Sequence, residues 1–178
     1  MDERRRNLWP LPGGARSYAS NLRILLKGVG EGKSRSDLEK VVGKLAPTVR
    51  SASTLRGYAA VPITLGFVEP AEGRALRLTH TGERYARTGD LSVLRRTLVD
   101  RVLGIEELLQ EVAKGPTTCR VLTERLAEQG IAWNHPMAVR YRVWWLVSAR
   151  AVDAVRDSRV DRLSLSRPGR QLLARRRS

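Results

Sequence analysis

The residues that could carry acid–base, redox or metal chemistry are few and scattered. The chain has two histidines, His80 and His135, and a single cysteine, Cys119, which excludes an internal disulfide and a multi-cysteine zinc site. No Ser-His-Asp order, glycine-rich phosphate loop or carboxylate pair has the spacing that catalysis requires. Residues 37–40 combine acids with a lysine as some nuclease metal sites do, but they fall in a predicted helix rather than on strands. We therefore expect no catalytic residue, no metal, no cofactor and no enzyme activity.

The strongest chemical feature of the chain is its positive charge. Lys and Arg number 33 against 18 Asp and Glu, which gives a net charge of +15. Only five of the basic residues are lysine, a preference that a GC-rich genome explains, but genome bias does not explain the excess of base over acid. Such a protein repels itself, and a polyanionic partner relieves the repulsion. Nucleic acid is the partner we expect, ahead of an acidic protein or a membrane surface.

The sequence also bears on where the protein works. No window approaches the roughly 20 apolar residues needed to span a bilayer. The first residues combine charge, proline and paired glycine rather than the apolar stretch of a secretory signal. A single cysteine fits a reducing compartment. We expect a cytoplasmic, nucleoid-associated protein without a membrane partner.

Hydrophobic periodicity divides the chain into an arm and two halves. Residues 1–16 lack helical spacing, so we expect a flexible basic arm. Residues 17–90 predict helices over 17–29, 34–45 and about 48–62, where Pro62 should interrupt or kink the third, then strands 66–69 and 74–78 and a helix from 79. Residues 91–178 predict a helical stretch over 91–112 bent near Gly104, helices from 116 and from Asn134 to about 150, strands 152–155 and 162–165, and a helix over 168–175. The fold class is mainly α with short β-hairpins (α+β).

The two halves repeat at specific residues. Residues 78–85 and 165–172 both read Leu, a hydroxyl residue, two variable positions, Gly, two more and a large apolar residue. The hydroxyl residue should cap the helix that follows the hairpin, and the glycine should let that helix approach the body closely. Upstream, residues 67–69 match residues 151–153. A duplicated module is the interpretation we favour.

The same stretches resemble known DNA-recognition modules. Residues 65–69, then 76–79, then Gly82, resemble the winged-helix ending of many bacterial regulators. Residues 96–109 followed by 139–146 are similar to tandem winged-helix modules of some restriction endonucleases and related defence proteins. The resemblance covers about residues 17–173 and implies two tandem winged-helix units, over 17–90 and 91–178. One departure is Arg150-Ala151, which stands where the family has Gly-Leu before the first wing strand.

A winged helix places its third helix in the major groove, so exposed residues of that helix are the candidates for reading bases. Arginine can pair with guanine in a bidentate manner and asparagine with adenine. In the first unit the candidates are Arg50, Ser51, Ser53, Thr54 and Arg56, and in the second they are Asn134, His135, Arg140, Tyr141 and Arg142.

The hairpins and chain ends carry further candidates for phosphate contact. Arg74 and Arg77 lie on the first hairpin and Arg159 on the second, although acidic neighbours dilute their charge. The arginine clusters at residues 4–6 and 175–177 could grip phosphates, but most such runs are merely solvated. Of Trp133, Trp144 and Trp145 we expect at least two in the core, with Trp145 the surest, and an exposed one could stack on a base or seal a dimer.

These expectations converge on duplex DNA binding, by a transcriptional regulator or by the recognition component of a restriction or defence system. Two alternatives remain open, a protein-interaction module within a larger complex and a binder of RNA or single strands. Two units in one chain could straddle successive groove faces as a monomer, or the stretch over 91–112 could pair two copies into a homodimer.

Overall fold

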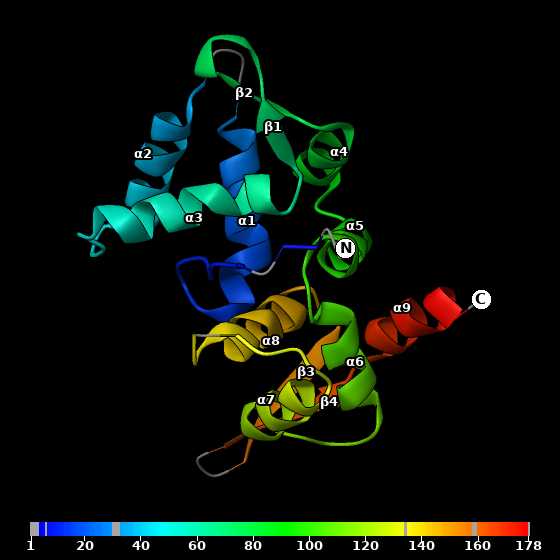
Figure 1. Cartoon of the computed structure of the whole chain (residues 1–178). Helices are drawn as coiled ribbons and strands as arrows, with labels where there is room; N and C mark the ends of the chain where they lie inside the picture. Colours follow the sequence, from blue (N-terminus) through cyan, green and yellow to red (C-terminus); the bar gives the residue numbers. More distant parts are fainter. Residues whose placement is uncertain (1–3, 6, 30–32, 134, 158–159, 178) are drawn as a thin grey trace.

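The computed structural model describes residues 4–5, 7–29, 33–133, 135–157 and 160–177. Within these ranges the chain is mainly helical with two antiparallel hairpins, which confirms the expected α+β class (Figure 1). Three helices, a hairpin and a helix follow one another twice, and α5 connects the two sets. The first set is α1 (Tyr18–Lys27), α2 (Arg35–Leu45), α3 (Ala52–Thr64), β1 (Val68–Pro70), β2 (Leu76–Leu78) and α4 (His80–Thr88). After α5 (Leu91–Arg101) come α6 (Ile105–Ala113), α7 (Cys119–Glu128), α8 (Ala138–Ser148), β3 (Val152–Asp157), β4 (Val160–Leu165) and α9 (Arg167–Arg177).

Helix α3 differs from its expected bounds at both ends. It begins later because Ser51 is its N-cap, where the side chain accepts a hydrogen bond from the backbone N–H of Thr54. It also continues past Pro62, which was expected to interrupt or kink it. Pro62 lies in the last turn, where it removes only one N–H from the helix, and its ring is buried in the core.

Helix α8 begins at Ala138, later than expected, and Pro136 precedes the helix instead of lying in its first turn. Asn134, the expected cap, lies outside the described residues. The expected bend near Gly104 is confirmed, because this glycine has a φ of 84° and separates α5 from α6.

In each set, the segment just before the second helix forms backbone contacts with the hairpin. In the first set the N–H of Leu76 donates to the carbonyl of Lys33, 2.6 Å away, and Ser34 bridges Ala75. In the second set Thr117 and Leu163 exchange two backbone hydrogen bonds of 3.0 and 2.8 Å. The two sets therefore share this tie as well as their order of elements.

The expected cap and glycine are present at equivalent positions. The hydroxyls of Thr79 and Ser166 accept from the N–H of Gly82 and Gly169, at 3.1 and 3.0 Å. A Cβ added at Gly82 would lie 2.0 Å from the carbonyl oxygen of Phe67, and one added at Gly169 would lie 2.1 Å from that of Ala151. Only glycine allows both helices to approach the turn before the hairpin this closely.

That turn is conformationally the same in both sets although its residue differs. Gly66 has a φ of 69° and Arg150 a φ of 54°, and the carbonyls of these two residues accept from the hydroxyls of Thr79 and Ser166. The departure at Arg150 thus leaves the geometry intact. Its cost is that a residue with a Cβ occupies the left-handed region.

Arg150→Gly should therefore raise the free energy of unfolding by about 0.5–1 kcal/mol, the relief of left-handed strain less the extra chain entropy that glycine brings to the unfolded state. Urea denaturation measures the change. Arg140→Gly, on the exposed face of α8, should lower stability by about 1 kcal/mol instead, because glycine disfavours a helix. Loss of stability in Arg150→Gly would contradict the assignment of strain.

One hydrophobic core runs through both sets. The first helix of the chain, α1, packs on α8, where the ring centroids of Tyr18 and Trp145 lie 5.2 Å apart and Ser148 accepts from the backbone N–H of Ala19. Trp145 is fully buried, and Trp133 and Trp144 are half-buried against the core. The expectation for Trp145 is confirmed, whereas Trp133 and Trp144 are only partly buried and pack against the core.

The described residues of the arm pack against the rest of the molecule. Arg5 pairs with Val102 as a short parallel bridge, Leu8 and Leu11 are buried, and the carbonyl of Trp9 accepts from the indole N–H of Trp145 at 2.9 Å. The arm lacks periodicity because it is an extended strap held by contacts distant in sequence.

Candidate nucleic-acid interface

The residues proposed on the third helix of the first set are mostly exposed, with differing local roles. Arg50 and Arg56 are exposed, and Arg50 lies just before α3 rather than on it. Ser51 caps the helix, its hydroxyl lies 2.8 Å from that of Ser53, and Thr54 is half-buried. The two arginines are therefore the strongest candidates for contact with an anion here.

The end of α3 also brings in a basic residue that sequence reasoning missed. The Arg35 guanidinium, at the start of α2, donates to the backbone carbonyl of Arg56 at 3.4 Å. This contact places Arg35 beside Arg56 of α3. In the structure Arg35 follows Ser34, the N-cap of α2, and the packing of α2 on α3 brings it beside Arg56.

The third helix of the second set presents an aromatic and basic surface at its amino-terminal end. His135 and Arg140 are exposed, and Tyr141 is half-buried. The ring centroid of Tyr141 lies 5.8 Å from that of His135 and 5.8 Å from that of Trp144. These residues form a row of rings flanked by a cation, a surface able to contact bases or sugar–phosphate backbone.

Arg142 was expected on the exposed face, and this expectation is wrong. It is 1% exposed, and its guanidinium donates to the carbonyls of Leu103 and Ala138 at 2.8 and 3.0 Å. The guanidinium carbon also lies 4.2 Å from the ring centroid of Trp133, in cation–π geometry. Burial lowers the pKa of Arg142 to about 10, which leaves it charged at neutral pH. Its positive charge therefore interacts with groups inside the protein and is not available at the surface.

The hairpins offer less free charge than the helices. Arg77 is paired with Glu69 at 2.7 Å, so much of its charge is compensated within the first hairpin. Arg74 is exposed at the tip, where its φ of 68° follows Gly73 in the left-handed region. Arg159 lies outside the described residues.

The two third helices face the same way. The amino-terminal ends of α3 and α8 point to the same side of the molecule, on the left of Figure 1, and the β3–β4 hairpin extends to that side too. A helix amino terminus carries partial positive charge and free N–H groups, which favour anions. We call this surface the α3–α8 face, defined by Arg50, Arg56, His135, Arg140 and Tyr141.

Basic side chains also lie elsewhere. A groove of about 520 Å³ between α5 and α9 is lined by Arg95, Arg96, Arg175 and Arg176, together with Asp100. It lies on the right-hand side of Figure 1, away from the amino-terminal ends of α3 and α8. Arg176 is paired with Asp100, and Arg95 donates to the carbonyl of Ala149, so part of this charge is engaged. Charge density alone does not select one face.

The acidic run that superficially suits a nuclease has a structural role. Asp37 accepts from the backbone N–H of Ser34 at 3.0 Å and closes a capping box at the start of α2. This hydrogen bond, with contributions from Lys40 and the Ser34 hydroxyl, holds the pKa of Asp37 well below its usual range. The carboxylate is committed to the helix end.

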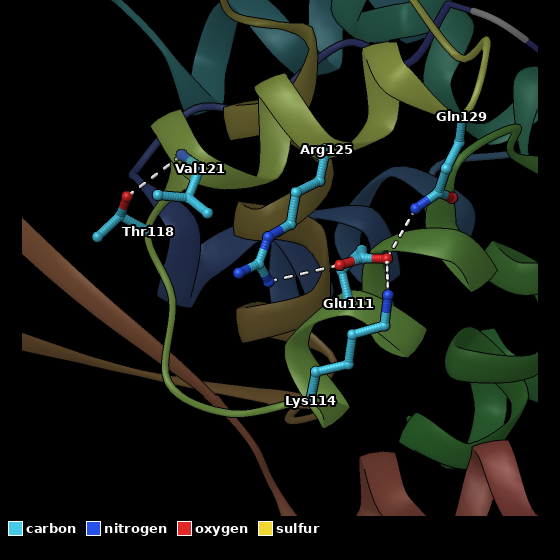
Figure 2. A network of polar contacts seen from close by, with 6 residues as sticks. All are labelled: Glu111, Lys114, Thr118, Val121, Arg125 and Gln129. Carbon is cyan, nitrogen blue, oxygen red and sulfur yellow. Dashed lines mark hydrogen bonds and ion pairs between the residues drawn. The ribbon is translucent and has the colours of Figure 1, made fainter.

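A buried carboxylate joins the first two helices of the second set. Glu111 is 2% exposed, and Figure 2 shows Lys114, Arg125 and Gln129 converging on it. The side-chain amide of Gln129 donates to Oε1 of Glu111 at 2.7 Å, and Nη1 of Arg125 lies 3.5 Å from Oε2 of Glu111. Hydrogen bonding from Lys114, then from Gln129, and the charges of Lys114 and Arg125 hold the pKa of Glu111 below its usual value. The network fixes α7 against α6.

Because the pKa of Glu111 is lower in the folded chain than the ordinary value of about 4.3, its stabilisation is complete above that value and is lost as the pH falls through the folded pKa. Glu111→Gln should lower the free energy of unfolding by about 1–2 kcal/mol at pH 7, since the partners are half-exposed, and by much less at pH 3. Denaturation at both pH values tests this. Glu124→Gln, in an exposed pair with Arg120, should cost only a few tenths of a kcal/mol, and an equal loss in both variants would contradict the prediction.

No family model, no curated protein and no solved structure matches the chain. In the part of the chain that the structure describes, none of the helices has both the length and the apolar character needed to cross a bilayer.

Proposed function

We propose that the chain binds duplex DNA through two winged-helix units in tandem, the first built around α3 and the second around α8. The observation that carries the proposal is the repeated framework combined with a shared orientation. Both sets have the same hydroxyl cap, the same glycine against a backbone carbonyl and the same left-handed turn before the hairpin. Both third helices direct their amino-terminal ends to one side (Figure 1).

The chemistry of the α3–α8 face supports this proposal. Arg50, Arg56 and Arg140 are exposed, and no described acidic side chain is paired with any of them. Arginine provides both charge for phosphates and a planar fork for guanine. The net charge of +15 adds attraction for any polyanion over longer distances.

The proposal covers two biological roles, a transcriptional regulator and the recognition component of a restriction or defence system. In both roles the chain itself recognises DNA and needs no catalytic residue. Selection from a random duplex library distinguishes sequence-specific from general binding, because a site read by base contacts loses roughly 1–3 kcal/mol per mismatched pair.

The first test is a gel shift of the full chain with random duplex at low salt, repeated as salt is raised. Binding should weaken steeply, with a log–log slope of about −0.9 per neutralised phosphate. A salt-insensitive complex would count against the proposal. Preference for single strands or RNA over duplex would support a single-strand binder instead. No binding to any nucleic acid would leave a protein-interaction module as the function to pursue.

A further inference from the structure

Beside the amino-terminal end of α8 lies a pocket that shares His135 and Tyr141 with the α3–α8 face. It has a volume of about 370 Å³, near the lower end of the range of about 300–1,000 Å³ for small-ligand sites. Leu8 and Trp9 from the arm form one part of its lining, and Trp133, His135, Tyr141 and Arg142 form another. Its surface is more apolar than polar and is dominated by rings.

The arm holds one wall of the pocket in place between the two sets. The carbonyl of Trp9 accepts from Trp145, and its ring covers Gly57 of α3 so closely that a Cβ there would lie 2.5 Å from it. The same ring meets Tyr58 edge-on, with centroids 6.3 Å apart. Even so, 42% of Trp9 is exposed, unusually much for so large an apolar side chain.

The opposite wall is held equally firmly. The end of the Trp133 ring lies against Gly104, where a Cβ would be 2.6 Å away, and the Arg142 guanidinium lies over its face. Within the described residues the indole N–H of Trp133 is buried without a hydrogen-bond partner. A buried donor without an acceptor is uncommon in folded proteins. His135 and Tyr141 add two more rings at the rim.

We infer that this pocket binds one planar heteroaromatic ring of nucleobase size. Stacking on several aromatic side chains favours a flat π-system, and the small volume limits the ligand to about one nucleoside. The ring could come from a free nucleoside or from a base extruded from bound DNA, because the pocket adjoins the α3–α8 face. The second source rests on the proposed function, whereas the first does not.

The key variant fills the pocket without removing a wall. Ala132 lines the pocket and is exposed, so Ala132→Phe should occupy the space and leave the core intact. Ala113→Phe, at an exposed position on α6, is the matched control. Trp9→Ala removes one stacking ring, and its thermal unfolding is measured beside that of Ala132→Phe so that loss of folding is recognised.

Two measurements on the full chain separate the sources. In the first, each of the four nucleosides is titrated into the protein by calorimetry without DNA. In the second, affinity for a duplex with one mismatched pair is compared with affinity for its fully paired counterpart. Since a mismatched base costs less to extrude, base capture should favour the mismatched duplex by about 10-fold. Whichever of the two effects the unmodified chain shows, nucleoside binding or mismatch preference, Ala132→Phe should abolish that effect. Ala113→Phe should retain the same effect.

The outcomes decide the two proposals separately. Nucleoside binding without mismatch preference supports the pocket with a free ligand, and the reverse supports it with a DNA base. Tight binding of paired duplex with neither effect overturns the pocket and leaves the proposed function standing. Failure to bind any duplex overturns the proposed function, and the nucleoside titration alone then decides the pocket. Either effect surviving unchanged in Ala132→Phe would also overturn the assignment.

Discussion

Replacing Arg142 with alanine should lower the free energy of unfolding by about 2–4 kcal/mol. The substitution empties a fully buried site, and it removes the donor that satisfies the carbonyl of Leu103. Each unsatisfied buried acceptor costs about 1–3 kcal/mol, and the cavity adds to this. The cation–π contact with Trp133 is lost as well.

Arg140→Ala is the matched control, because it lies two residues away on the same helix and is exposed. It should change stability by no more than about 0.5 kcal/mol. Arg142→Met separates volume from charge, since methionine fills much of the space without donating hydrogen bonds. Urea denaturation of the three variants measures the effects. If Arg142→Ala were as stable as Arg140→Ala, the buried role assigned to Arg142 would be wrong.

The sequence contained the information needed to place Arg142. It follows Val139 by three residues and precedes Leu146 by four, so it falls on the apolar stripe of α8, whereas Arg140 does not. Its charge favours the exposed face, but its position in the helix places it among the apolar residues. Long basic side chains can be buried when their donors find acceptors, and backbone carbonyls provide them here.

Local chemistry predicted the repeated features well. The caps at Thr79 and Ser166 and the glycines that follow them depend on residues three positions apart, so a short stretch of sequence is enough to recognise them. The hairpins were likewise recognisable from alternating strands around a turn. The carboxyl-terminal bound of α3 was harder to predict, because tolerance of Pro62 depends on the packing of its buried ring.

Contacts between distant residues could not be predicted. The strap formed by the arm depends on the Trp9–Trp145 hydrogen bond and on the pairing of Arg5 with Val102, and neither leaves a periodic pattern. The aromatic pocket is invisible in the sequence for the same reason, since its walls come from the arm and from the segment before α8. The presence of Arg35 beside Arg56 also required the packing of α2 on α3.

Removing the charge of Arg50, Arg56 and Arg140 together, each as Arg→Gln, should weaken duplex binding roughly 100-fold at about 0.1 M salt. If each arginine neutralises one phosphate, the log–log salt slope should become shallower by about 2.7. All three are exposed, so stability should be unchanged. Fluorescence anisotropy over a range of salt concentrations gives both the affinity and the slope.

The matched control removes the same net charge from the other side of the molecule, as Arg87→Gln, Arg96→Gln and Arg175→Gln on α4, α5 and α9. Both triple variants change the net charge from +15 to +12, so general attraction to a polyanion falls equally in the two. Only the location of the lost charge differs. The control should therefore lose less than about 5-fold in affinity, with a nearly unchanged slope. Equal losses would mean that DNA is held by diffuse charge, and a larger loss in the control would transfer the interface to the groove between α5 and α9. In both cases the α3–α8 face would no longer be the binding surface.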